Sequence, residues 1–141
     1  MMNFQLTPYL MLNGTAKEAV QFYQKVLGAE VVFIQTFGEG PEEFVNSLSS
    51  EEKGRIAHSV LKIGDSALYV GDVETRMAPV KGNQIMLCIT TRDVKESQRL
   101  YELLQKEGGV VNQPLQSTYF SPSYGVVTDR FGVTFQVFTR K

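Results

Sequence analysis

The sequence has almost no cysteine or histidine and no excess of basic residues. Its 141 residues include one cysteine, Cys88, and one histidine, His58. A single cysteine excludes an internal disulfide and fits a reducing compartment. Because Cys88 lies in an apolar strand run, we expect it to be a small buried hydrophobic residue. Fourteen basic against fifteen acidic residues leave a net charge of −1, which argues against a nucleic-acid partner.

Targeting and membrane signals are also missing. The N-terminus has no basic region, and Pro8 interrupts its apolar run, so no signal peptide is expected. No apolar run approaches the roughly 20 residues that a membrane helix needs. We therefore expect a cytoplasmic protein without membrane contact. With 43% hydrophobic and 21% charged residues, the composition is that of a globular chain.

What the chain does contain is a long internal repeat. Residues 7–32 read as a strand, an Asn-Gly turn, an amphipathic helix ending at Gly28 and a second strand, and residues 85–111 repeat this order. Hairpin patterns over residues 55–70 and 124–138 close the two halves. The order predicts an α+β fold of two tandem βαβββ modules. We expect one domain, 1–141, made of module 1 (1–72), a linker (73–83) and module 2 (84–141).

Local signals mark the expected helix ends. Thr15 with Glu18, and Asp93 with Glu96, have the spacing of capping boxes. Gly28 predicts a left-handed C-cap. Asp72, after the first hairpin, is expected to form a turn or to orient a ligand or a neighbouring loop.

Residues 38–54 form a long polar and acidic connection with one proline. Connections of this length are usually lids, binding loops or disordered segments. A short helix near Glu42–Leu48 is one expectation, and a solvated flap without a partner is the alternative.

Several segments resemble the PhnB-like branch of the vicinal-oxygen-chelate superfamily, which includes glyoxalase, extradiol dioxygenases, and fosfomycin and bleomycin resistance proteins. They are TPYLMLNGTAKEAVQFY from Thr7, HSVLKIGDSALYVGD from His58, PLQSTYF from Pro114 and YGVVTDRFGV from Tyr124. The resemblance covers the whole chain. It implies that each module curls a mixed sheet into a half-barrel with its helix outside, and that the concave faces enclose a cavity. It also implies a homodimer, for which an open sheet edge offers a physical route.

Metal-dependent members of the superfamily hold an ion with four ligands, usually His or Glu. By resemblance, the four positions correspond to Thr7 or Pro8, to Leu68, to Met86 or Gln84, and to Gln136. Leucine and methionine cannot act as anionic or imidazole donors, and a neutral glutamine amide is a weak one. We therefore expect no metal and no cofactor, and a small-molecule ligand in the cavity.

His58 is the main candidate for a polar role in that cavity. On its strand, the set that includes Ser59 and Leu61 is the better helix-facing stripe, which turns His58 toward the cavity. There it would bond a ligand or act as a general base, whereas the alternative is a core histidine satisfied by protein groups. The expected ligand-binding residues are His58, Gln136, Met86, Leu68, Tyr9, Phe37, Phe120 and Tyr124. The aromatic members, together with Tyr119, are equally explained by sheet packing.

Three functions remain open. The first is a metal-free binding protein that sequesters or senses a small molecule. The second is a glyoxalase- or dioxygenase-type enzyme that uses His58 as a base, or an atypical metal site completed by Glu39, Glu42 or Glu43. The third is a structural module with a collapsed cavity. Some members of the branch carry a methyltransferase label, for demethylubiquinone, but the sequence lacks the strand, glycine loop and helix of a nucleotide-type cofactor fold.

Overall fold

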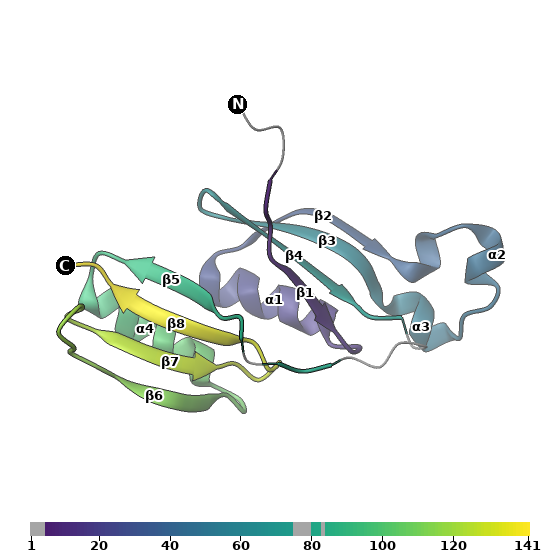
Figure 1. Cartoon of the computed structure of the whole chain (residues 1–141). Helices are drawn as coiled ribbons and strands as arrows, with labels where there is room; N and C mark the ends of the chain where they lie inside the picture. The colour runs from purple at the N-terminus through teal and green to yellow at the C-terminus, as the bar shows by residue number, and fades with distance from the viewer. Residues whose placement is uncertain (1–4, 75–79, 83) are drawn as a thin grey trace. The chain divides into compact units, whose positions relative to one another are not determined.

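The computed structural model describes residues 5–74, 80–82 and 84–141, and most of the predicted linker 73–83 lies outside them. The chain divides into two units, Met1–Val80 and Lys81–Lys141, each with its own four-stranded sheet. Each unit runs strand, helix and three strands along the chain (Figure 1). The predicted α+β class and the tandem βαβββ order are therefore confirmed. No helix in these ranges has the length and apolar content needed to cross a bilayer.

The first unit is a mixed sheet with one helix on a face. Its strands lie in the order β1 (Tyr9–Leu12), β4 (Ser66–Asp72), β3 (Ile56–Ile63) and β2 (Glu30–Thr36). Strand β1 runs parallel to β4, and the other neighbours are antiparallel. Helix α1 (Ala16–Leu27) buries one stripe against this sheet: Ala16, Ala19, Val20, Tyr23 and Val26. The apolar spacing read from the sequence is the spacing that this packing uses.

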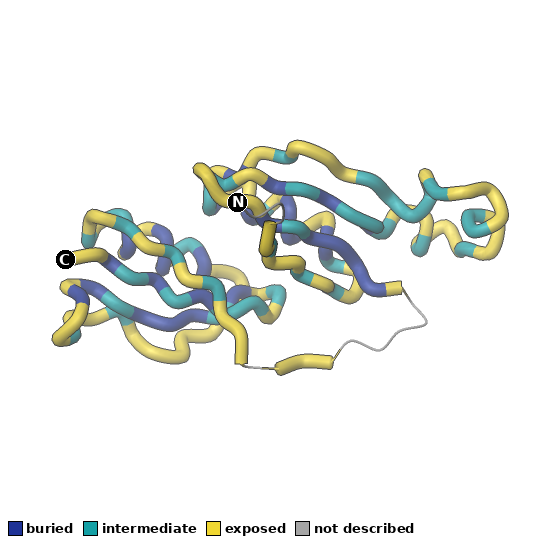
Figure 2. The backbone as a smooth tube through the Cα atoms, turned by 45° about the horizontal axis from the view of Figure 1, so that its top comes forward, coloured by how far each residue is buried: buried dark blue, intermediate teal, exposed yellow. Residues whose placement is uncertain are grey.

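The second unit repeats the topology. Its strands lie in the order β5 (Leu87–Thr91), β8 (Thr134–Thr139), β7 (Tyr124–Thr128) and β6 (Val110–Gln116), with β5 parallel to β8. Helix α4 (Val94–Gln105) buries Ser97, Leu100, Tyr101 and Leu104. In both units the buried strand residues lie on the central strands, whereas the outer strands β2 and β6 are largely exposed, as Figure 2 shows.

The N-terminus of α1 is capped by a residue far away in the sequence. The predicted capping box at Thr15 is wrong, because the Thr15 side chain makes no capping hydrogen bond. Instead, Asp72 Oδ1 accepts hydrogen bonds from the backbone N–H groups of Gly14 (2.8 Å) and Ala16 (3.1 Å). Its Oδ2 accepts one from the N–H of Ile56 at 3.0 Å. Asp72 was expected either to form a turn or to orient a ligand or a neighbouring loop. The structure shows that it orients the neighbouring backbone at Gly14, Ala16 and Ile56.

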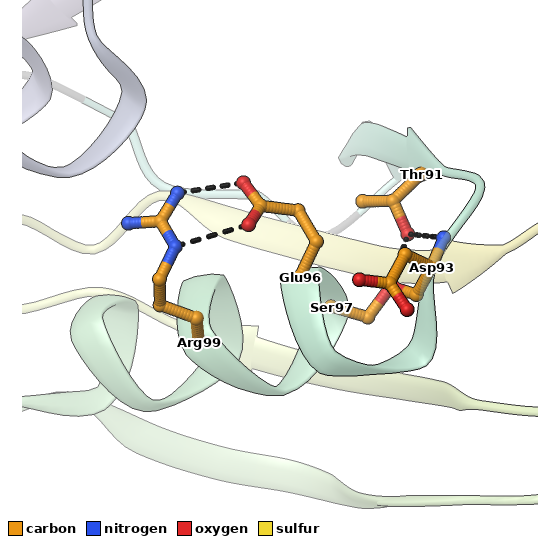
Figure 3. Close-up of polar contacts among 5 residues, drawn as sticks. All are labelled: Thr91, Asp93, Glu96, Ser97 and Arg99. Carbon is orange, nitrogen blue, oxygen red and sulfur yellow. Dashed lines mark hydrogen bonds and ion pairs between the residues drawn. The ribbon is translucent and has the colours of Figure 1, made fainter.

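The N-terminus of α4 follows the sequence more closely. Asp93 accepts a hydrogen bond from the N–H of Lys95 at 3.3 Å, which confirms it as the N-cap. Glu96 does not complete a capping box; it forms an ion pair with Arg99, with a shortest N–O distance of 2.6 Å (Figure 3). The hydrogen bond from Arg99 lowers the pKa of the Glu96 carboxyl. An i,i+3 pair of opposite charge competes with capping because both use the same carboxylate.

The acidic connection 38–54 folds into three short helices, η1 (Phe37–Glu39), α2 (Glu42–Val45) and α3 (Ser50–Gly54). Helix α2 confirms the short helix expected near Glu42–Leu48. The ends of the connection are joined by a hydrogen bond from the Phe37 N–H to the Arg55 carbonyl at 3.0 Å. Capping boxes at Thr36–Glu39 and Ser49–Glu52 fix its turns. No residue of the three helices is buried, so we call this segment the acidic flap.

Candidate functional site

Strand alternation divides each sheet into a helix face, which packs on α1 or α4, and a far face on the opposite side. Along β3, Ser59 and Leu61 are completely buried on the helix face, as their stripe predicts. His58 therefore lies on the far face of the first sheet. On the neighbouring strand β4, Leu68 is 5% exposed and belongs to the core of the helix face. The side chain of Leu68 thus does not lie beside His58, and its neighbour Tyr69 occupies that place.

His58 contacts three aromatic rings on the far face. Its Nδ1 is 2.9 Å from the hydroxyl oxygen of Tyr9. The ring centroids of Tyr69, Tyr9 and Phe33 lie 5.0, 5.3 and 6.2 Å from that of His58. We call these four residues the Tyr9–His58 cluster. Burial raises the pKa of the Tyr9 phenol above its ordinary value, so this hydroxyl stays protonated and can donate a hydrogen bond near neutral pH.

The cluster draws one residue from each of the four strands of the first sheet. Tyr9 from β1 and Tyr69 from β4 are direct partners in the parallel pairing. Phe33 from β2 is paired with Val60, two residues beyond His58 on β3. The structure therefore joins His58 and Tyr9, which were both predicted, to Tyr69 and Phe33, which were not. Tyr69 and Phe33 could have been predicted from the sequence, because alternate residues of a strand lie on the same face of the sheet and aromatic residues on that face would be neighbours of His58.

The far face of the second sheet carries a separate, uncharged set of predicted residues. Gln136 Nε2 lies 3.7 Å from the sulfur of Met86. Phe120 and Tyr124 have ring centroids 4.9 Å apart, and Phe120 stacks on Phe138 at 6.1 Å. The structure thus places four of the predicted residues in two contacting pairs, Gln136 with Met86 and Phe120 with Tyr124. Sequence reasoning missed Phe138, which alternates with Gln136 along β8.

Two further expectations concern Phe37 and Cys88. Phe37 directly precedes the acidic flap and contacts Phe44 of α2, with ring centroids 5.9 Å apart. Cys88 is exposed, so its expected burial is wrong. It is paired with Gln136 in the parallel ladder, which turns its side chain to the far face, and not to the helix face that holds the core.

The donor groups present do not fit a divalent metal ion. Over residues 5–74, 80–82 and 84–141, no three His, Cys, Asp or Glu side chains gather as a metal-holding group. Leu68 is in the core, and the Met86–Gln136 pair offers only a thioether and a neutral amide. Glu39 of the acidic flap uses its Oε1 to accept from both the N–H and the hydroxyl of Thr36, each at 3.1 Å.

Comparison with known proteins gives consistent matches along the chain. The family described as 3-demethylubiquinone-9 3-methyltransferase matches residues 4–138. Protein YjdN of Escherichia coli (strain K12) is 30% identical over 139 residues, covering 94% of this chain and 92% of YjdN. Protein PA1353 from Pseudomonas aeruginosa is 31% identical with a TM-score of 0.86, covering 98% of both chains.

A more distant solved structure shares the fold alone. It is a variant of the fosfomycin resistance protein FosX from Listeria monocytogenes, in complex with Mn(II) and 1S,2S-dihydroxypropylphosphonic acid. It is 11% identical to this chain with a TM-score of 0.67, covering 98% of this chain and 93% of FosX.

Proposed function

This chain belongs to the family described as 3-demethylubiquinone-9 3-methyltransferase, the PhnB-like branch of the vicinal-oxygen-chelate superfamily, and we propose that it binds a small organic molecule without a metal ion. The Tyr9–His58 cluster is the observation that supports this proposal. Ligand sites combine aromatic walls with a few placed polar groups. The cluster has this composition, since three rings surround one imidazole.

We propose binding without a metal ion because of the chemistry of the available donor groups. FosX binds Mn(II), an ion that prefers carboxylate, imidazole or water ligands. At three of the four positions that the family resemblance assigns to metal ligands, this chain has a core leucine and a thioether–amide pair. A test is to incubate the protein with Ni²⁺, Zn²⁺ or Mn²⁺ and to measure the bound ion after desalting. We expect well under one ion per chain, and one tightly held ion would overturn this part of the proposal.

We do not extend the proposal to methyl transfer, the activity in the family's description. A nucleotide-type cofactor uses a glycine-rich turn and the N-terminus of the following helix. In this chain the turn from β1 to α1 is already occupied by the Asp72 carboxylate, which bonds the N–H groups of Gly14 and Ala16. At this turn, the N–H groups that would receive such a cofactor are therefore engaged within the protein.

We also propose a cytoplasmic homodimer. Strand β2 is an edge strand with three exposed apolar side chains in a row, Val32, Phe33 and Ile34, which are 62%, 47% and 41% exposed. Such an edge is a template for pairing with another chain. Light scattering should give twice the chain mass, and Val32→Lys should reduce the measured mass.

The proposed compartment rests on the thiol of Cys88, which is free and exposed and therefore fits a reducing environment.

Binding is tested by nuclear magnetic resonance with aromatic fragments as probes. The chain has one histidine, so the ring signals of His58 are unambiguous. We expect phenol, added in steps, to shift the His58 and Tyr69 ring signals saturably, and His58→Phe to weaken that binding. Lys17→Gln, on the exposed side of α1, is the matched control and should bind as the wild type does. Fragments that leave the His58 signals unmoved would refute the proposed site.

A further inference from the structure

The hydroxyl group of Tyr9 lies between two groups of strand β3. It donates a hydrogen bond to the carbonyl oxygen of Ala57 at 3.3 Å, and it is 2.9 Å from His58 Nδ1. A phenol has one proton to donate and can accept through its oxygen. The direction of these two contacts therefore decides which nitrogen of His58 carries a proton.

Local irregularity in the sheet makes the Ala57 carbonyl available. The β2–β3 ladder pairs Gln35 with His58 and Thr36 with Ile56, and the β3–β4 ladder begins at Val60, so Ala57 has no partner in either ladder. A Cβ at Gly71 would come within 3.1 Å of both the Ala57 carbonyl oxygen and the Tyr9 hydroxyl. Glycine at this position thus leaves the space in which these two groups meet.

Only one direction satisfies both contacts. The Ala57 carbonyl can only accept, so the Tyr9 proton points to it, and the Tyr9 oxygen then accepts from an N–H at His58 Nδ1. The reverse direction would leave the Tyr9 and Ala57 oxygens facing each other at 3.3 Å without a proton between them. The remaining nitrogen, Nε2, makes no hydrogen bond to any described residue. Among the described residues, the buried side-chain atoms without a partner do not include Nε2, so this atom is accessible. It therefore reaches solvent with a free lone pair.

We infer that neutral His58 carries its proton on Nδ1 and offers Nε2 as a hydrogen-bond acceptor, so that the ligand is an uncharged aromatic molecule with a hydroxyl or N–H donor. This inference rests on the proposed function of the cluster and specifies its ligand class. The rings of Tyr69 and Phe33 lie beside the imidazole and can contact a flat apolar body.

The charges near the cluster agree with an uncharged ligand. Lys62 lies on the same face, four residues along β3 from His58, which is about 13 Å of strand. Its partner across the ladder is Glu30, of opposite charge. No salt bridge in the described part of the chain includes His58. A donor on the ligand, and not a net charge, is therefore the feature that this surface can select.

The tautomer is measured directly on the full chain. Long-range proton–nitrogen correlation spectra of ¹⁵N-labelled protein, recorded at about pH 9, where imidazole is neutral, distinguish the two nitrogens of the single histidine. We expect Nδ1–H in the wild type and loss of this preference in Tyr9→Phe. Tyr69→Phe is the matched control, since the Tyr69 ring touches His58 while its hydroxyl makes no hydrogen bond to it, and it should keep the Nδ1–H form. A wild-type spectrum showing Nε2–H would overturn the inference, whatever binds.

The ligand class is tested with phenol and anisole, two rings of similar shape of which only phenol has a donor. Phenol should bind about two- to tenfold more tightly, as one hydrogen bond predicts, and His58→Phe should remove the difference. Equal affinities of the two fragments at His58 would overturn the ligand class while the proposed binding site stands. If neither fragment reaches His58, both the ligand class and the proposed site are refuted.

Discussion

Replacement of Asp72 by alanine should destabilise the first unit more than any surface substitution. The carboxylate is 2% exposed and accepts three backbone hydrogen bonds, from Gly14, Ala16 and Ile56, at 2.8 to 3.1 Å. A hydrogen bond to a charged group contributes about 1.5–3 kcal/mol. The three bonds share one side chain and are not additive, so we expect a loss of about 3–6 kcal/mol. This is a large part of the about 5–15 kcal/mol that stabilises a typical domain.

The asparagine variant separates the two oxygens. Asp72→Asn keeps an acceptor for Gly14 and Ala16, while its amide N–H₂ would face the N–H of Ile56. One hydrogen bond is then lost and two donors oppose each other, so we expect a smaller loss of about 1–3 kcal/mol. Urea unfolding followed by circular dichroism gives the free energies. In Asp72→Ala, amide exchange should accelerate at Gly14, Ala16 and Ile56, whereas in Asp72→Asn it should accelerate mainly at Ile56.

The matched control is Asp93→Ala, which removes an exposed N-cap with one long hydrogen bond, 3.3 Å, to Lys95. Loss of such a cap costs about 0.5–2 kcal/mol. The reasoning about Asp72 is refuted if its alanine variant loses no more stability than Asp93→Ala. It is also refuted if the three amides exchange at wild-type rates.

Two further predictions concern the second unit. Tyr101→Phe should lower the free energy of unfolding by about 1–2 kcal/mol, because the one hydroxyl proton lies within hydrogen-bond distance of two carbonyl oxygens, that of Gln113 at 2.6 Å and that of Val126 at 3.2 Å. Burial raises the pKa of Tyr101, so its contribution is full below the unfolded pKa of about 10 and is lost as pH rises through the folded value. In urea titrations, Tyr101→Phe should therefore lose less stability than the wild type at alkaline pH; equal slopes would contradict this. The exposed Cys88 should react with an aromatic disulfide reagent in the native protein, one thiol per chain, and reaction only after denaturation would contradict its placement.

Features that depend on neighbours in the chain were predictable. Gly28 adopts φ 66° and ends α1, as a left-handed C-cap does, and Gly64 turns the β3–β4 hairpin at φ 59°. The helix stripes and the face of His58 follow from periods of 3.6 and 2 residues. Such features are decided by sterics and local hydrogen bonds, which the order of residues alone specifies. The repeat of these local patterns was enough to predict two βαβββ units.

The sequence alone therefore determined the elements, their order and the candidate histidine, whereas the tertiary structure decided which side chains meet. Asp72 replaces Thr15 as the cap of α1 because folding brings a carboxylate 56 residues away to that turn. Tyr69, and not Leu68, lies beside His58 because the β3–β4 ladder pairs Leu68 with the buried Leu61, so that Leu68 shares its face. The ladder partner of Cys88 likewise lies on the far face, and Cys88 is exposed. Distances between strands far apart in sequence are set by ladder register, which no local pattern encodes.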